Sequence, residues 1–154
     1  MSLGTNMTDT GLDGEYDNQN IFAKILRGEL PCHKVFEDDL VLAFMDVFPQ
    51  APGHVLIVPK VKARTILDFP TEKLGEYMAR VQRIALGIKE ALKPDGISMF
   101  QFSGAAGGQS VFHLHFHLVP RLENSLLKGH GNIERADDAE LKSFATAIGN
   151  AIGA

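Results

Sequence analysis

The sequence predicts a single α+β domain in which antiparallel strands carry one long helix. Short β-prone runs alternate with turn residues across 33–60 and 97–120, so neighbouring strands connect through tight turns. An amphipathic stretch over 70–92 has helical spacing, and a final helix is expected over 137–152. No internal repeat or long linker divides the chain, and 154 residues suit one hydrophobic core.

Composition narrows the classes of function. Hydrophobic residues make up 45% and charged residues 22% of the chain, an ordinary globular mixture. The net charge of −4 and the absence of a basic run argue against nonspecific nucleic-acid binding, but not against a small nucleotide. Cys32 is the only cysteine, which excludes an intramolecular disulfide and favours the cytoplasm. We find no signal peptide and no apolar run near the roughly 20 residues of a membrane span.

The N-terminal part divides into a lead-in and the first helix. Residues 1–19 are rich in Gly, Asn, Asp and Thr, which predicts a flexible lead-in before a single domain over 20–154. Residues 21–27 have apolar side chains at helical spacing. Asn20 is suited to cap the start of this helix, and Gly28 is suited to end it.

Three strands are expected next. Residues 33–37 and 40–46 are expected to form a hairpin around the turn Asp38–Asp39. Residues 54–59 are almost entirely aliphatic, which is typical of a central strand.

The long helix is predicted from Pro70 to Leu92. Thr71 is expected to cap its start, and the Pro-Asp-Gly run at 94–96 is expected to stop the helix. A strand over 97–102 follows. The apolar stripe expected to face the sheet comprises Leu74, Met78, Val81, Ala85, Ile88 and Leu92.

The most informative stretch is QSVFHLHFHLVP, residues 109–120. Strict alternation predicts a strand with two unlike faces, on which residues i and i+2 lie roughly 6.7 Å apart. His113, His115 and His117 would then share one face, with apolar side chains on the other.

Three interpretations of these histidines stay open on the residues alone. Each imidazole could be an ordinary solvated or hydrogen-bonded side chain. The three could bind a metal, with Cys32, His33 or His54 as further ligands. Alternatively, one imidazole could attack phosphorus or an acyl carbon while its neighbours protonate the leaving group.

Other segments favour a phosphate or nucleotide ligand. The small-residue loop from Gly104 to Ser110 is either a flexible connection or a cradle of backbone N–H groups for an anion. His54, at a strand start, is a candidate fourth histidine. Asp46 would cap a turn or hold a ribose diol. Side chains that would be core or would wall a base pocket are Phe22, Ile25 and Phe44.

The segment QSVFHLHFHLVPR resembles the signature of the histidine triad (HIT) superfamily. IFAKILRGELP and FEDDLVLAFMDVFPQAPGHVLIVPK match in order and spacing, so the resemblance covers about residues 20–121. The chain is most similar to the bacterial, Hint-like nucleotide-binding branch. It is less similar to the diadenosine polyphosphate hydrolases or the galactose-1-phosphate uridylyltransferases.

The resemblance implies a fold and an activity. The expected fold is a five-stranded antiparallel sheet with one long helix and short flanking helices, in a homodimer that joins two sheets into ten strands. The expected reaction is hydrolysis or transfer at the α-phosphorus of purine nucleoside phosphoramidates or related AMP or GMP conjugates. His115 would form a nucleotidyl-histidine intermediate, and no metal or cofactor would be needed.

The resemblance also assigns the remaining residues. The residues expected around the phosphate are His113, His117, His54 and Ser110, with Gln109 and Ser110 on phosphate oxygens or the leaving group. Asp46 would hold the ribose. The nucleotide-binding set comprises Asp46, Val47, Phe22, Ile25, Phe44, Gln109, Ser110, Gly108 and Ser103.

The sequence departs from the family pattern at two places that bear on the site. Many bacterial relatives bind structural zinc, but here Asn20, Ala23 and Lys62 occupy three of the four ligand positions and only His113 remains. We therefore expect no zinc. Phe102 and Ser103 stand where relatives carry an asparagine before the loop glycine. Two further functions stay open, a nucleotide-binding regulatory protein with incidental catalysis and a diadenosine polyphosphate hydrolase.

Overall fold

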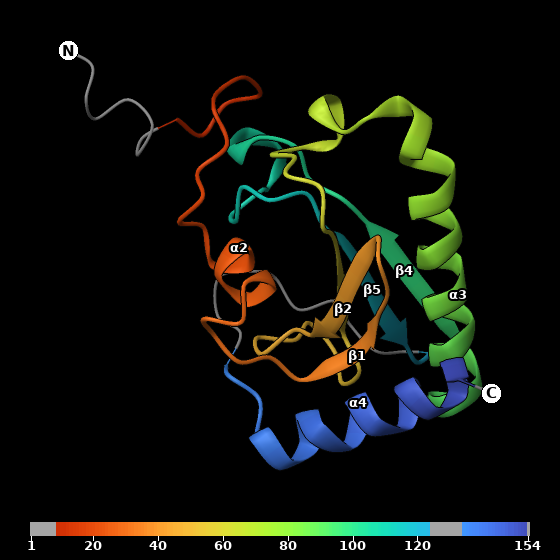
Figure 1. The fold of residues 1–154 in the computed structure, drawn as a ribbon. Helices are drawn as coiled ribbons and strands as arrows, with labels where there is room; N and C mark the ends of the chain where they lie inside the picture. Colours follow the sequence, from red (N-terminus) through yellow and green to blue (C-terminus); the bar gives the residue numbers. More distant parts are fainter. Residues whose placement is uncertain (1–8, 124–133, 154) are drawn as a thin grey trace.

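The computed structural model describes residues 9–123 and 134–153, and it confirms the α+β class (Figure 1). Five antiparallel strands form one sheet in the order β1-β2-β3-β5-β4. The strands are β1 (Lys34–Glu37), β2 (Val41–Met45), β3 (Val55–Pro59), β4 (Gly96–Phe100) and β5 (Phe116–Arg121).

Three α-helices flank the sheet in the described residues: α2 (Ile21–Leu26), α3 (Leu74–Leu92) and α4 (Asp138–Gly153). Short 3₁₀ turns cover η1 (Ile66–Asp68), η2 (Thr71–Lys73) and η3 (Ala105–Gly107). Asn20 caps α2 as expected, since its side-chain oxygen accepts the Ala23 N–H at 2.9 Å. None of the helices in the described ranges has the length and apolar character needed to cross a bilayer.

The two faces of the sheet bury different sets of side chains. Because side chains alternate along a strand, Ala43 and Ile57 face one way while Phe44 and Leu56 face the other. The first face packs on α3 and α4 and forms the main core. The second face forms a smaller cluster with Phe22 of α2 and leaves room for a cavity. Figure 1 shows α3 and α2 on opposite sides of the sheet.

The buried face of α3 differs from the expected stripe. Val81 and Ile88 are buried as predicted, but the centre of the face also contains Tyr77 and Ile84. The other four predicted positions are only partly buried and flank this face. The Thr71 cap was also wrong. The first turn there is 3₁₀, α3 begins at Leu74, and no side chain caps it. Lys93 ends the helix in a left-handed conformation.

Two glycines allow α4 to pack closely. A Cβ on Gly87 of α3 would lie 2.4 Å from Cγ1 of Ile152, so the two helices approach through this position. A Cβ on Gly149 would lie 2.9 Å from the carbonyl oxygen of Val35 in β1. The C-terminal helix therefore rests on both α3 and the sheet edge, with Ile148 fully buried between them.

The N-terminal segment is bound to the domain where it is described. Within the expected lead-in over 1–19, residues 1–8 lie outside the described residues. From residue 9 onward the chain contacts the domain. The buried Arg64 guanidinium donates to the carbonyl oxygens of Asp9 and Gly11 at 3.1 and 3.2 Å. The Ala105 N–H donates to the Thr10 carbonyl at 2.8 Å.

Candidate active site

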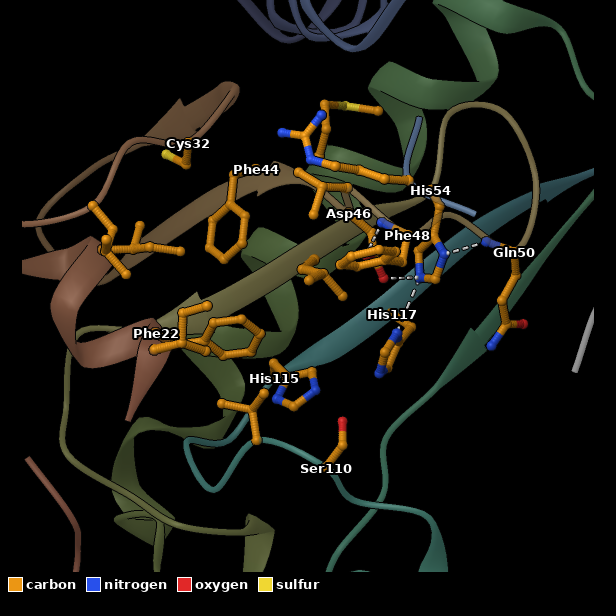
Figure 2. Close-up of a pocket in the computed structure, with 18 of the residues that line it drawn as sticks. Phe22, Cys32, Phe44, Asp46, Phe48, Gln50, His54, Ser110, His115 and His117 are labelled. Carbon is orange, nitrogen blue, oxygen red and sulfur yellow. Dashed lines mark hydrogen bonds and ion pairs between the residues drawn. The ribbon is translucent and has the colours of Figure 1, made fainter. Parts of the chain in front are cut away.

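A cavity of about 760 Å³ opens on the face of the sheet opposite α3 (Figure 2). Most of the residues expected to bind a nucleotide line it. These are Phe22, Ile25, Phe44, Asp46, Val47, His54, Gly108, Ser110, His115 and His117. The structure does not place His113, Gln109 or Ser103 among the lining residues.

The histidine segment is not a continuous strand. Strand β5 begins at Phe116, and its pairing with β3 starts there, so His113 and His115 precede the strand. The chain before Phe116 turns away from the ladder, and the Leu114 N–H donates instead to the Ala63 carbonyl at 2.8 Å. The expected row of three imidazoles on one face was therefore wrong. His115 and His117 line the cavity, while His113 is fully buried beside them.

His115 presents an unprotonated nitrogen to the cavity. Its Nδ1 lies 2.6 Å from the His113 carbonyl oxygen, which can only accept, so Nδ1 carries the hydrogen. Nε2 of the neutral ring then has a lone pair. Burial lowers the pKa of His115 from 6.5 to about 4, which keeps the ring neutral at pH 7. A neutral imidazole held in one tautomer is suited to nucleophilic attack.

His54 and His117 form a hydrogen-bonded pair with a defined direction. The Gln50 backbone N–H donates to His54 Nδ1 at 3.0 Å, so the hydrogen of the neutral His54 ring is on Nε2. His54 Nε2 lies 3.0 Å from His117 Nδ1, which therefore accepts. The remaining N–H of His117 is on Nε2, where it is suited to donate to a group in the cavity.

Packing holds the His117 ring in place. His117 pairs with Leu56 of β3 on one side and with Phe100 of β4 on the other. The Phe100 ring stacks on the imidazole at 4.6 Å between centroids and 20° between planes. The sheet therefore fixes this histidine from both neighbouring strands.

Asp46 lies at the end of β2, beside the histidine pair. Its Oδ1 accepts the Phe48 N–H at 2.9 Å, the turn-capping contact expected of an aspartate there. Its Oδ2 lies 3.6 Å from His54 Nε2. The carboxylate thus combines the local turn role with a place in the cavity lining.

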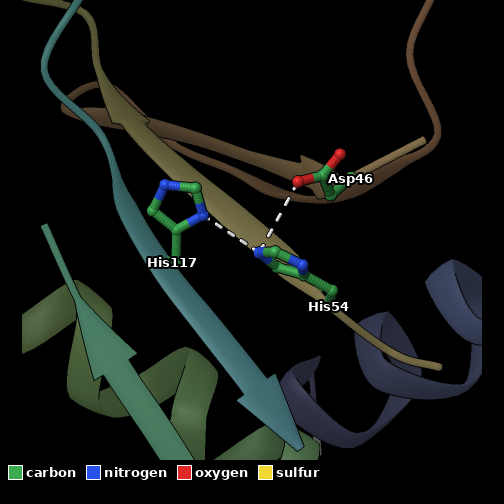
Figure 3. Close-up of side chains that lie close together, drawn as sticks. All are labelled: Asp46, His54 and His117. Carbon is green, nitrogen blue, oxygen red and sulfur yellow. Dashed lines mark hydrogen bonds and ion pairs between the residues drawn. The ribbon is translucent and has the colours of Figure 1, made fainter. Parts of the chain in front are cut away.

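Asp46, His54 and His117 also offer three donor atoms within 4.8 Å of one another (Figure 3). This spacing would suit a metal ion, but the hydrogen positions do not. The Gln50 N–H occupies the lone pair of His54 Nδ1, so Nε2 carries a hydrogen where a metal would need a lone pair. The arrangement favours proton transfer over metal binding. The expectation of a metal-free site stays a prediction.

The residues at the positions that bind zinc in relatives make other contacts in this protein. Asn20 caps α2, Ala23 is buried in α2, and Lys62 is exposed on a loop. The Nδ1 of His113 contacts the Tyr16 hydroxyl, and its Nε2 contacts the Pro59 carbonyl.

Gln109 and Ser103 shape the loop and do not line the cavity. The Gln109 Oε1 accepts the Gly104 N–H at 2.8 Å, and its Nε2 donates to the Arg64 and Val111 carbonyls. The Ser103 Oγ accepts from Gln101 at 2.8 Å. The expected contact of the Gln109 side chain with phosphate is not supported by this geometry.

One end of the cavity is apolar and flat. The Phe22 ring meets Phe44 edge-to-face at 5.5 Å and meets His115 at 4.8 Å. Ile25 and Val47 complete a surface that fits a planar aromatic group, and Cys32 lies half-buried at its rim.

Sequence reasoning missed several residues of the site. They are Tyr16, the backbone of Gln50, Phe100, Phe102 and Arg135. The contact of Phe100 with His117 depends on the β5-β4 pairing, which no local pattern gives. Arg135 reaches the cavity because the next residue, Ala136, donates its N–H to the Val47 carbonyl at 2.8 Å. Val47 directly follows Asp46 and is far from Ala136 in sequence, so no local pattern indicates this contact.

Comparison with known proteins decides the family. Residues 27–124, more than half of the chain, match the family described as the HIT domain. The chain belongs to the HIT family. The matched range of this HIT protein contains β1 to β5, α3 and the four histidines that surround or support the cavity.

Individual relatives agree with this assignment. The HIT protein superposes on the crystal structure of a Hit-like protein involved in cell-cycle regulation from Bartonella henselae with a TM-score of 0.85 and 46% identity, covering 90% of this chain and 99% of that one. It is 39% identical to the purine nucleoside phosphoramidase of Escherichia coli over 66% of this chain and 86% of that protein. It is 36% identical to the adenylylsulfatase HINT3 of Arabidopsis thaliana over 77% of this chain and 60% of that protein.

Proposed function

We propose that this HIT protein is a nucleotide-binding hydrolase that cleaves purine nucleoside phosphoramidates or related AMP or GMP conjugates at the α-phosphorus. The observation that carries the proposal is the tautomer of His115, whose Nε2 lone pair faces a cavity that also contains His117. The phosphoramidase relative supports the substrate class, and the adenylylsulfatase relative supports reaction at an adenylyl phosphorus.

The first step forms a covalent intermediate. Nε2 of His115 attacks the α-phosphorus, and the bond from phosphorus to the leaving nitrogen breaks. The leaving amine takes the electron pair of that bond and a proton from Nε2–H of His117. His54 keeps its Nε2 hydrogen and donates it to His117 Nδ1 across the 3.0 Å contact, which stabilises the charge left on the His117 ring until water returns a proton to Nε2 in the second step.

The second step releases the nucleotide. Water attacks the phosphorus of the nucleotidyl-His115 intermediate and gives up one proton to His117. The bond from phosphorus to Nε2 breaks, and the electron pair returns to His115. The products are the nucleoside monophosphate and the regenerated histidines. No step requires a metal or a redox partner.

The cavity lining supports the placement of the substrate. The apolar end around Phe22, Ile25, Phe44 and Val47 takes the purine, and Asp46 accepts hydrogen bonds from the ribose hydroxyls. Ser110, exposed at the rim, and the Gly108 backbone contact phosphate oxygens or the leaving group.

We also propose a homodimer joined along β4. This strand is at one edge of the sheet and leaves its outer backbone groups for a second copy. Met99 on β4 is 52% exposed, so this edge presents a large apolar side chain. A cytoplasmic location and the absence of nucleic-acid and membrane partners stay predictions.

The decisive experiment traps the intermediate. The protein is mixed with adenosine phosphoramidate, quenched in base and examined by peptide mass spectrometry. We expect adenylate on His115, and no adenylated peptide in His115→Ala. His33→Ala is the matched control, because His33 lies outside the cavity lining and contacts Asp138.

The same experiment separates the other functions. Unchanged turnover in His115→Ala would overturn the nucleophile assignment. Micromolar AMP binding without adenylation would instead indicate a regulatory nucleotide-binding protein. A substrate panel that adds adenylyl sulfate and diadenosine polyphosphates would reassign the reaction if either turned over much faster than the phosphoramidate.

A further inference from the structure

Tyr16, in the segment before α2, makes a directed hydrogen bond to His113. The Tyr16 hydroxyl lies 2.5 Å from His113 Nδ1, and the two rings meet edge-to-face at 5.6 Å. His113 Nε2 lies 2.7 Å from the Pro59 carbonyl, which can only accept, so Nε2 carries the hydrogen. Nδ1 is therefore the acceptor and Tyr16 the donor. Burial raises the pKa of Tyr16, which keeps its hydroxyl protonated.

His113 in turn supports the nucleophile through its backbone. Its carbonyl oxygen accepts the Nδ1–H of His115 at 2.6 Å, the contact that leaves Nε2 of His115 unprotonated. The orientation of this carbonyl depends on how residue 113 is held.

Few regular contacts hold this part of the chain. Residues 111–115 precede β5 and have no partner in the β3 ladder. The hydrogen bonds that tie them to other segments include the Leu114 N–H on the Ala63 carbonyl, the Gln109 amide on the Val111 carbonyl, and the two ring bonds of His113. Arg64 also lies over the Phe112 ring, and Phe22 meets His115 edge-to-face. Tyr16 supplies one of the two ring bonds and is 97 residues away in sequence.

We infer that Tyr16 is a positioning residue for catalysis, because it fixes His113 so that the His113 carbonyl holds His115 in its nucleophilic tautomer. The residue does not line the main cavity and does not touch the reacting atoms. The expected effect of Tyr16 on kcat rests on the proposed hydrolase function. Its expected effect on the His115 tautomer is independent of that function.

The test compares two tyrosine hydroxyl deletions. Tyr16→Phe keeps the ring and removes the donor to His113. Tyr77→Phe is the matched control, because Tyr77 is fully buried and its hydroxyl donates to a backbone carbonyl, that of Ile57 at 2.7 Å, without touching a histidine. We expect Tyr16→Phe to lower kcat for adenosine phosphoramidate about tenfold with KM little changed. Tyr77→Phe should lower the melting temperature and leave kcat near wild type.

Nitrogen-15 NMR of the histidine rings supplies a readout independent of activity. In the wild type, His115 should show a protonated Nδ1 and an unprotonated Nε2, and His113 the reverse. In Tyr16→Phe, the His115 signals should shift toward a mixture of tautomers, while Tyr77→Phe should leave them unchanged.

The possible results distinguish failure of this inference from failure of the proposed function. Wild-type kcat and unshifted His115 signals in Tyr16→Phe would overturn the inference, and so would equal kcat losses in the two variants. If the wild type hydrolyses no substrate, the proposed function fails, and the His115 signals alone decide the inference. If Tyr16→Phe does not fold, the wild-type spectrum decides, because a protonated Nδ1 on His113 would exclude Tyr16 as a donor.

Discussion

Nε2 of His54 lies 3.0 Å from Nδ1 of His117, and the backbone N–H of Gln50 determines which of the two nitrogens carries the hydrogen. The pair is buried, with His54 1% and His117 7% exposed, so water does not compete for this bond. One N–H group from a loop thus sets the direction of the hydrogen bond between the two side chains.

Removing His54 should affect leaving groups unequally. His54→Ala should lower kcat about 10²-fold for a phosphoramidate with an alkylamine leaving group, because that amine needs a proton as it departs. The loss should be much smaller for the p-nitrophenyl ester of AMP, whose leaving group departs as a stable anion. Steady-state kinetics with both substrates test this. Equal losses would show that His54 acts on something other than leaving-group protonation.

Acid should destabilise the protein through His115. The unfolded imidazole has a pKa of 6.5 and the folded one a pKa of about 4, so the unfolded state takes up the proton first as pH falls. The free energy of unfolding should therefore decrease by roughly 3 kcal/mol between pH 7.5 and 4 from this group. Urea denaturation of wild type and His115→Asn measures it. The variant should lose less stability over this range, and parallel curves would contradict the prediction.

Asp46 should recognise the ribose hydroxyls. Asp46→Asn keeps an oxygen for the Phe48 N–H but removes the negative charge, so affinity for AMP should fall about tenfold. Affinity for 2′,3′-dideoxy-AMP should be weak in wild type and hardly change in the variant. Calorimetry with both ligands tests this, with Asp39→Asn as a surface control, since Asp39 is 94% exposed on the β1-β2 turn. Equal losses for the two nucleotides would indicate a role away from the ribose.

Two glycine substitutions in helices should have opposite effects. Gly149→Ala should destabilise the protein by about 1–3 kcal/mol, because the new methyl group would meet the Val35 carbonyl oxygen at 2.9 Å and backbone cannot move aside. Gly75→Ala, near the exposed start of α3, meets nothing within 4 Å and should stabilise by up to about 1 kcal/mol. Thermal unfolding of both variants measures this. A stabilising Gly149→Ala would mean that α4 packs further from β1.

Purified protein should contain far less than one zinc per chain. Three of the four expected ligand positions hold Asn20, Ala23 and Lys62, and His113 has both ring nitrogens in hydrogen bonds. A chelator should accordingly leave the melting temperature unchanged. An elemental analysis that finds close to one zinc ion per chain would contradict this prediction.

Much of the fold follows from local sequence signals. The β1-β2 hairpin forms around Asp38, whose Oδ1 accepts the Leu40 and Val41 N–H groups, as turn chemistry predicts. The aliphatic run of β3 is central because it is buried on both faces. The start of α3 was less predictable, since a Pro followed by Thr is compatible with a cap, whereas the chain makes a 3₁₀ turn there.

In the candidate site, too, local sequence patterns predicted some features and not others. Alternation predicted three histidines on one strand face, and it could not show that the ladder stops before His115 or that His113 lies outside the cavity lining. Burial of Gln109 by hydrogen bonds to Gly104 and Arg64 also depends on contacts between distant segments. The Tyr16 contact was hidden for a further reason, because the composition around it is typical of a flexible segment.

Arg64 links the segment before α2 to the loop before the histidines. Its guanidinium binds the Asp9 and Gly11 carbonyls, and its own carbonyl accepts from the loop before the histidines. A chain shortened to begin at residue 20 would keep every strand, yet it would leave a buried cation without these acceptors. We therefore expect a chain that begins at residue 20, the boundary suggested by composition, to be less stable than one that begins by residue 9.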